Sequence, residues 1–221
     1  MAQTSRAFHV AVTRGDTVIV WGGQVNSDHF LPGSQVMIFN IDQNRWSPRM
    51  TTGDVPPGLS DAAAAVLDDA MYVVGGWTAG REFSRDIWSL NLNSFVWTRL
   101  SPEGVPPLRC FGAAAWSHED KIWMFGGQGD PPSDSQSLQL GLSGGRYVPL
   151  DDEEGISNQL VCYNTATNAW EWLASSGTAP SPRAGHSVAK VDGTVYVFGG
   201  RQENTVNDFY SLDLNTLRFE N

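Results

Sequence analysis

The stretch TVYVFGG, residues 194–200, contains the pattern that decides the fold of this protein. Five residues that are almost all apolar are followed at once by two glycines. The same pattern occurs three more times, as TVIVWGG at 17–23, AMYVVGG at 70–76 and KIWMFGG at 121–127. A short apolar run without polar alternation is typical of a strand buried on both faces. Glycine has no Cβ and ends such a strand where the backbone needs unusual dihedral angles or a close neighbour.

The four patterns form a repeat. Their first glycines are Gly22, Gly75, Gly126 and Gly199, at intervals of 53, 51 and 73 residues. The last interval equals a period of about 52 residues with an insertion of about 21, which we place at about residues 128–157. We therefore expect one repeat domain over residues 1–221. Its four units are expected at about residues 6–50, 59–101, 109–175 and 183–221.

Other features recur in step with the glycines. A second strand follows each pair and ends in Asn or Asp, and an aromatic residue comes six positions later: Asn40 and Trp46, Asn91 and Trp97, Asn164 and Trp170, Asp213 and Phe219. Each unit then has a linker, such as TTGDVPPG or SPEGVPPL, and a strand of small residues, such as AAAAV. We predict four antiparallel strands per unit, a to d, with a tight turn between c and d. Such units must stack on one another to bury their faces, with the small-residue strands innermost.

These motifs resemble the kelch repeat, whose units form the blades of a β-propeller. The resemblance covers Arg6 to Asn221 and implies an all-β, kelch-type propeller with four four-stranded blades. The segments GDVPP and APSPRAGHSVAKV, with YVFGGR, are similar to the kelch domain-containing substrate receptors of cullin–RING ubiquitin ligases. That likeness implies a protein-interaction module that reads a client's C-terminal degron and whose full-length form has elongin and cullin subunits as partners. The alternative is a free-standing kelch scaffold for a small GTPase or a cytoskeletal protein.

Kelch propellers usually close with five to seven blades, and four are present here. We expect an incomplete, open propeller, and three explanations stay open. The chain is a truncated product, or an open arc completed by a partner or a second copy, or a closed four-bladed ring. An open arc would leave two sheet faces exposed.

Composition and the absence of certain motifs exclude several classes of function. The net charge of −10 and the pI near 4.7 argue against a nucleic-acid partner. The sequence has no signal peptide and no apolar run long enough to span a membrane, so we expect a cytoplasmic or nuclear protein. Cys110 and Cys162 lack metal-ligand spacing and are expected to be reduced core residues. No catalytic or metal-binding motif is present, so we expect neither an enzyme nor a cofactor.

The ligand is expected where the b–c loops and d–a linkers emerge on the same side of the blades. The candidate residues after the glycines are Gln24, Trp77, Arg81, Gln128 and Arg201, and those before strand a are Arg6, Arg109 and Arg183. Arginines with a tryptophan suit a peptide carboxylate.

These candidates have alternatives. Arg6, Arg109 and Arg183 occupy equivalent repeat positions, which favours a shared structural role over ligand binding. The resemblance to the degron receptors implies that Arg201 holds the client carboxylate. Thr205 and Ile156 stand where those receptors have a second basic residue and an aromatic residue. His9 and His186 share a repeat position too and are expected to be architectural.

The insertion is rich in Gly, Ser, Pro and Asp and contains DDEEG at 151–155. On this composition we expect it to be disordered or ordered only by a partner.

Overall fold

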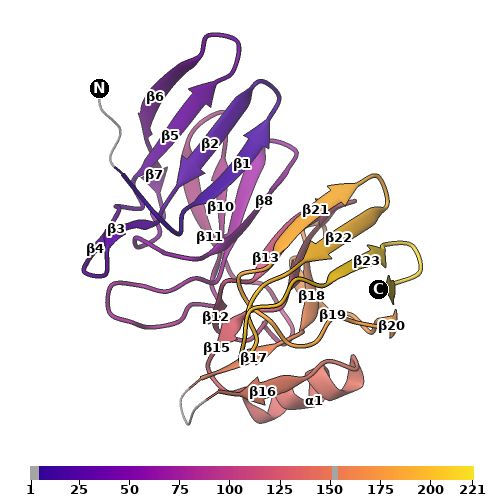
Figure 1. Ribbon diagram of the computed structural model, residues 1–221. Helices are drawn as coiled ribbons and strands as arrows, with labels where there is room; N and C mark the ends of the chain where they lie inside the picture. Colours follow the sequence, from indigo (N-terminus) through magenta and orange to yellow (C-terminus); the bar gives the residue numbers. More distant parts are fainter. Residues whose placement is uncertain (1–4, 151–153) are drawn as a thin grey trace. The chain divides into compact units, whose positions relative to one another are not determined.

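The computed structural model describes residues 5–150 and 154–221 (Figure 1). The acidic run 151–153 lies outside the described residues. The chain divides into two compact units, Met1–Ser101 and Pro102–Asn221, which are described separately.

The first unit contains two large sheets and a small ribbon. Blade 1 has the strand order β1-β2-β5-β6, formed by β1 (Val10–Arg14), β2 (Thr17–Trp21), β5 (Gln35–Asn40) and β6 (Arg45–Met50). Blade 2 has the order β7-β11-β10-β9-β8, formed by β7 (Thr52–Gly53), β8 (Ala63–Leu67), β9 (Ala70–Val74), β10 (Ile87–Asn91) and β11 (Val96–Leu100). The ribbon pairs β3 (Gln24–Asn26) with β4 (His29–Phe30).

The second unit repeats this plan and adds a small sheet. Blade 3 has the order β13-β14-β18-β19, formed by β13 (Ala114–His118), β14 (Lys121–Phe125), β18 (Leu160–Asn164) and β19 (Ala169–Trp172). Blade 4 has the order β20-β24-β23-β22-β21, formed by β20 (Ser176–Gly177), β21 (Ser187–Val191), β22 (Thr194–Phe198), β23 (Phe209–Asp213) and β24 (Arg218–Glu220). The small sheet has the order β12-β15-β17-β16 and comprises β12 (Cys110–Phe111), β15 (Gln128–Gly129), β16 (Tyr147–Pro149) and β17 (Gly155–Ser157).

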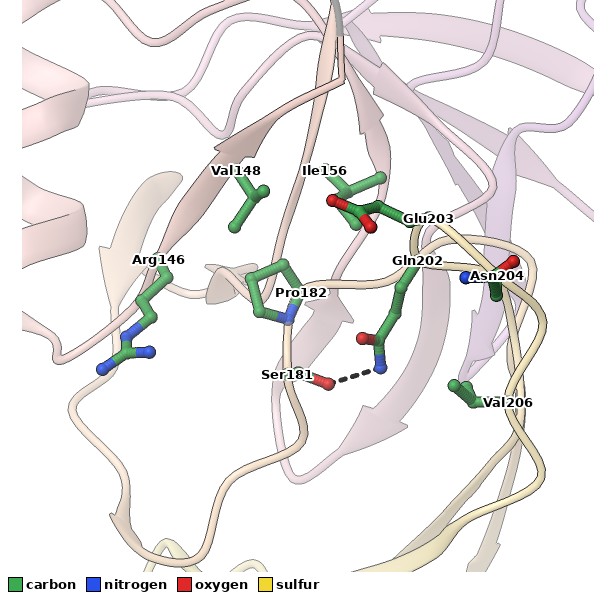
Figure 2. A pocket seen from close by; sticks show the side chains of 9 residues that line it. All are labelled: Arg146, Val148, Ile156, Ser181, Pro182, Gln202, Glu203, Asn204 and Val206. Atoms are coloured by element: carbon green, nitrogen blue, oxygen red, sulfur yellow. Dashed lines mark hydrogen bonds between the residues drawn. The ribbon is translucent and has the colours of Figure 1, made fainter.

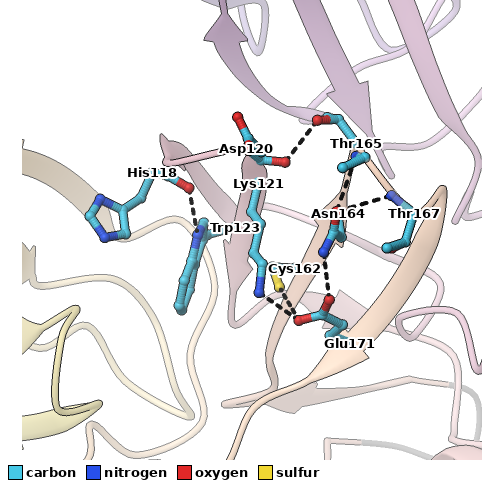
Figure 3. Close-up of polar contacts among 10 residues, drawn as sticks. His118, Asp120, Lys121, Trp123, Cys162, Asn164, Thr165, Thr167 and Glu171 are labelled. Carbon is cyan, nitrogen blue, oxygen red and sulfur yellow. Dashed lines mark hydrogen bonds and ion pairs between the residues drawn. The ribbon is translucent and has the colours of Figure 1, made fainter.

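Each blade is therefore the predicted antiparallel a-b-c-d meander, and the all-β, kelch-type fold class with four blades is confirmed. The c–d turns are built by the recurring Asn or Asp. In blade 3, Asn164 Oδ1 accepts hydrogen bonds from the backbone N–H groups of Ala166 and Thr167 (Figure 3). Asp213 receives the equivalent pair of bonds in blade 4. A side-chain acceptor of this kind fixes a tight turn without help from other elements.

Within the first unit, blade 1 packs face to face on blade 2. Trp21 and Val36 of blade 1 lie in one buried cluster with Met71, Leu90 and Trp97 of blade 2. The rings of Trp21 and Trp97 are 5.2 Å apart, and both indole N–H groups are satisfied, by Gly33 O at 2.8 Å and Thr51 Oγ1 at 3.1 Å. Truncating either ring to Ala would cost about 3–5 kcal/mol.

The second unit uses the same repeat positions. Phe125 stands where Trp21 stands in blade 1, and Phe219 stands where Trp97 stands in blade 2. Phe125 and Phe219 are buried with ring centroids 5.6 Å apart, in a cluster that includes Val197 and Leu212. In both units, the residue before the Gly-Gly of the first blade and the aromatic of strand d of the second blade thus form the joint between the two blades.

In blade 3, the glycine pair ends strand b against blade 4. Gly126 and Gly127 have φ of +73° and +111°, a region that side chains disfavour. A Cβ on Gly126 would lie 2.7 Å from Arg183 O, and the N–H of Gly127 donates to that same carbonyl at 2.9 Å. Both predicted reasons for glycine, positive φ and close approach, are confirmed here.

A second glycine position was missed by sequence reasoning. Gly177 in the linker has φ +75°, and a Cβ there would lie 2.2 Å from Phe219 O. The linker strand β20 pairs in parallel with β24, so the linker that leaves blade 3 is attached to the outer strand of blade 4. In the first unit, β7 pairs in parallel with β11 in the same way, and a Cβ on Gly53 would lie 2.3 Å from Trp97 O.

The expectation of a disordered insertion is wrong for its described residues. It contains a helix, α1 (Asp134–Leu142), and the strands β15, β16 and β17. Leu140 of α1 is buried, and the buried Gln136 donates from Nε2 to Pro106 O and Pro107 O at 3.2 and 2.7 Å. Average composition misses such anchors because a few buried side chains and a strand ladder are enough to order a polar segment.

Candidate ligand-binding site

The b–c loops and d–a linkers meet at one end of each blade, as predicted. The residue after each Gly-Gly is paired in antiparallel fashion with a residue ahead of strand a: Gln24 with Ala7, Trp77 with Ser60, Gln128 with Phe111, and Arg201 with Ala184. This backbone pairing fixes the position of the first loop residue, and with it the Cα–Cβ direction of its side chain.

In the second unit two of the predicted residues come together. Arg201 Nη2 donates to Gln128 Oε1, which brings the loops of blades 3 and 4 into contact. Gln128 Nε2 in turn donates to Glu154 Oε2 at 2.6 Å. The buried amide of Gln128 thus has its oxygen toward a cation and its nitrogen toward an anion, which fixes its orientation. Sequence reasoning missed Glu154.

A cavity of about 420 Å³ lies beside this contact. Figure 2 shows the nine residues around it, which come from the insertion, the d–a linker and the b–c loop of blade 4: Arg146, Val148, Ile156, Ser181, Pro182, Gln202, Glu203, Asn204 and Val206. Gln202 Nε2 donates to Ser181 Oγ across the linker and the loop. The volume is within the range of small ligand pockets and suits one or two peptide side chains.

Strand register connects the cavity to Arg201. Ile156 pairs with Val148 on one side and with Gln128 on the other. Residues opposite each other across strands point to the same face of a sheet. The side chains of Val148 and Ile156 therefore share a face with Gln128, and the guanidinium of Arg201 reaches that face through its hydrogen bond.

The lining of the cavity is partly apolar and partly charged. Val148, Ile156, Pro182 and Val206 supply apolar surface, while Arg146 and Glu203 are exposed and carry opposite charges. With Arg201 beside it, the site offers cations for a carboxylate and an apolar surface for the residue next to it.

Arg183 has a structural role, so its inclusion among the ligand-binding candidates is corrected. Its side chain is 0% exposed and donates five hydrogen bonds, to Gly199 O, to both carboxylate oxygens of Asp208, and to the carbonyl and hydroxyl oxygens of Ser181. The guanidinium also lies 5.3 Å from the ring centroid of Tyr210. The hydrogen bond from Arg183 holds the pKa of Asp208 below its usual value. Burial makes Arg183 inaccessible to a ligand.

The equivalent arginines differ from it. Arg6 Nη1 donates to Gly22 O at 3.2 Å, the counterpart of the bond from Arg183 to Gly199 O. Arg109 is exposed, and the corresponding carbonyl, Gly126 O, accepts from Gln159 Nε2 at 3.1 Å. The shared structural role predicted for the three arginines therefore holds for Arg6 and Arg183, and Gln159 replaces Arg109.

Gln159 was missed by sequence reasoning. It is fully buried, and its Oε1 also accepts the backbone N–H of Leu108 at 3.0 Å. No repeat position signals this role, because the glutamine reaches the same carbonyl from the start of strand c.

The remaining candidates lie in the first unit. Gln24 is buried, and its Oε1 has no hydrogen-bond partner among the described residues. Trp77 makes an edge contact with Phe30, with ring centroids 5.9 Å apart. Arg81 is exposed at the tip of its loop, with φ +61°. Their participation in ligand binding stays a prediction.

A second polar cluster in blade 3 is structural. Glu171 accepts from Lys121 Nζ at 2.7 Å, from Asn164 Nδ2 at 2.9 Å and from Cys162 Sγ at 3.7 Å (Figure 3). Burial raises the pKa of the Cys162 thiol to about 12, and it does the same for Cys110. Both cysteines are free and buried, as predicted, and their thiols stay protonated.

Within residues 5–150 and 154–221, no group of three or more His, Cys, Asp or Glu side chains is arranged to hold a metal. The same part of the chain has no helix that is long and apolar enough to cross a membrane.

Comparison with known proteins agrees with this architecture. The profile of the KLHDC2/KLHL20/DRC7 Kelch-repeats domain matches residues 8–221. The chain belongs to the kelch-repeat family. Among its relatives in the family, Kelch domain-containing protein 2 of Bos taurus is 31% identical over 96% of this chain and 54% of its own length. Kelch domain-containing protein 1 of Mus musculus is 28% identical over 96% of this chain and 54% of its own length. Kelch domain-containing protein 3 of Bos taurus is 28% identical over 94% and 50%.

The kelch chain thus spans about half the length of these curated relatives. The family assignment supports a kelch-type protein-interaction module, and domains of this family are typically not catalytic.

Proposed function

We propose that this kelch domain recognises the C-terminal segment of a client protein at the cavity beside Arg201. The observation that carries the proposal is the contact between Arg201 and Gln128 next to the cavity lined by Val148 and Ile156. A ligand carboxylate is a stronger acceptor for a guanidinium than the neutral amide oxygen of Gln128. It would therefore replace Gln128 as the partner of Arg201, and the preceding ligand residue would occupy the apolar part of the cavity.

The wider role that we infer is substrate recognition for a cullin–RING ubiquitin ligase, in the cytoplasm or the nucleus. Support comes from the family assignment and from an accessible cavity on the loop side of blades 3 and 4. In this role the domain supplies only binding, and the catalytic steps belong to other subunits. The proposal therefore requires a protein partner and no cofactor.

Peptide binding tests the site. A library of peptides with free C-termini and its amidated counterpart would be titrated by fluorescence polarisation against the protein and its Arg201→Ala variant. We expect the free acids to bind better, and Arg201→Ala to weaken only these by about tenfold or more, since a charge-assisted hydrogen bond contributes about 1.5–3 kcal/mol. Arg218→Ala is the matched control, because Arg218 is an exposed arginine in strand d of the same blade. Equal binding of acid and amide would refute the carboxylate assignment.

Affinity purification tests the wider role. Recovery of elongin or cullin subunits with the protein from cells would support a ligase receptor. A stable small-GTPase or cytoskeletal partner without those subunits would instead support a scaffold.

A further inference from the structure

The side-chain amide of Gln128 lies between a cation and an anion. Its Oε1 accepts a hydrogen bond from Arg201 Nη2, and its Nε2 donates to Glu154 Oε2 at 2.6 Å. A guanidinium only donates hydrogen bonds and a carboxylate only accepts them, so a single orientation of the amide satisfies both neighbours. Glu154 therefore determines that Gln128 turns its oxygen toward Arg201.

The backbone fixes the positions of Gln128 and Glu154. Gln128 of β15 pairs with Phe111 on one side and with Ile156 on the other. The carbonyl of Glu154 accepts the N–H of Leu150 at 3.0 Å, at the end of the hairpin formed by β16 and β17. Gln128 is buried and Glu154 is partly buried, so the hydrogen bond between their side chains is stronger than a contact in open water.

The guanidinium of Arg201 is held by a weak acceptor. Arg201 is exposed, and among the residues that the structure describes it has no carboxylate partner. Its side chain donates instead to the neutral amide oxygen of Gln128, although the carboxylate of Glu154 lies on the other side of that amide. A direct ion pair with Glu154 would compete with a ligand carboxylate on equal terms. The amide keeps the cation and the anion apart, so that Arg201 has a partner that a carboxylate can replace.

We propose that Gln128 and Glu154 form an internal latch on Arg201, in which the amide occupies the place of the ligand carboxylate and Glu154 sets how firmly the amide is held there. This inference rests on the proposed function and adds its regulation. A ligand carboxylate displaces the amide oxygen because it is the stronger acceptor. A neutral ligand carbonyl gains little, since it only exchanges with an equivalent acceptor. The latch raises the threshold for binding at Arg201, and Glu154 is a positioning residue that acts through Gln128.

Two variants with opposite expected effects test the latch. Glu154→Gln replaces the anion by an amide that can donate or accept, so the amide of Gln128 is free to turn away from Arg201. We expect the peptide library with free C-termini to bind this variant about fivefold more tightly in fluorescence polarisation.

The second variant combines Gln128→Glu with Glu154→Gln. This exchange keeps the net charge and both side-chain types but places the carboxylate directly on Arg201. We expect it to bind the free acids more than about tenfold more weakly. A merely structural role of the pair would weaken binding in both variants. The amidated library should bind each variant as it binds the unsubstituted protein, because an amidated terminus does not use Arg201.

Glu220→Gln is the matched control, since it makes the same side-chain change at an exposed carboxylate of blade 4 outside the cavity. It should change either affinity by less than about twofold. Circular dichroism and thermal melts would establish that every variant is folded.

The outcomes separate the latch from the proposed function. Equal binding of acids and amides by the unsubstituted protein would refute the proposed function, and the latch with it. A preference for acids that is accompanied by unchanged or weaker binding to Glu154→Gln would overturn the latch alone. The absence of a loss in the exchanged pair would do the same.

Discussion

Removing the guanidinium of Arg183 should destabilise the second unit more than any other single arginine change in blade 4. The Arg183→Ala variant loses five hydrogen bonds, which leaves Gly199 O without its donor and Asp208 without its ion-pair partner. Breaking a buried ion pair by deleting one partner costs about 3–5 kcal/mol. Because the Asp208 side chain is 30% exposed, water can solvate it in the variant, and we expect a loss near the lower end, about 3 kcal/mol.

Arg183→Lys should recover part of this loss. An ammonium keeps the charge but cannot bind both oxygens of Asp208 while also reaching Gly199 O and Ser181, so we expect a loss of about 1–2 kcal/mol. The pH dependence follows from the low pKa of Asp208, which Arg183 maintains. The stabilisation is present above the ordinary carboxyl value of 3.8 and is lost as the pH falls through the lower folded value.

The assay is urea unfolding followed by tryptophan fluorescence, with hydrogen exchange of β22 and β23 peptides to assign the transition to the second unit. Arg218→Ala is the control, since Arg218 is exposed and pairs only with Glu220 among the described residues. It should change the free energy of unfolding by less than about 0.5 kcal/mol. If Arg183→Ala is no more destabilising than Arg218→Ala, the structural role given to Arg183 is wrong.

Two further predictions concern the contact between blades 3 and 4, near Arg183. Burial and the nearby Arg183 lower the pKa of His186 to about 4. In the unfolded protein the His186 imidazole titrates near 6.5, so its contribution to the free energy of unfolding should be complete above that pH and fall by about 3 kcal/mol as the pH drops from 6.5 to 4. Thermal melts across this pH range would measure the fall. In the His186→Phe variant this dependence of the melting temperature on pH should disappear. Gly126→Ala should cost about 2 kcal/mol or more, because φ is +73° and the new Cβ meets Arg183 O, whereas Gly141→Ala in α1 has open space and should gain up to about 1 kcal/mol in the same melts.

The candidate site was predictable only in part. Arg201 and Gln128 could be selected because both follow Gly-Gly pairs, whose loops the repeat places at the same end of the blades. Their mutual hydrogen bond could not be foreseen, since it depends on the side-chain directions of two loops that are 73 residues apart. Glu154 and the cavity were missed because they belong to the insertion, which has no counterpart in the other units.

Local chemistry explains what the amino-acid sequence determined by itself. The glycine pairs, the Asn or Asp at the end of strand c and the aromatic of strand d each act within a few residues, and each recurs in every unit. These signals specified four antiparallel blades and the order of their strands. Because the same local pattern occurs four times, the fold can be predicted from the sequence without knowledge of distant contacts.

Tertiary structure alone decided the roles of equivalent residues. Arg6, Arg109 and Arg183 have the same repeat position, yet one is partly buried, one is exposed and one is fully buried. The difference comes from distant partners: Asp208 neutralises Arg183, while Gln159 already occupies the carbonyl that Arg109 would need. A repeat fixes the path of the backbone, but the burial of a charge depends on which side chain from another segment is present to compensate it.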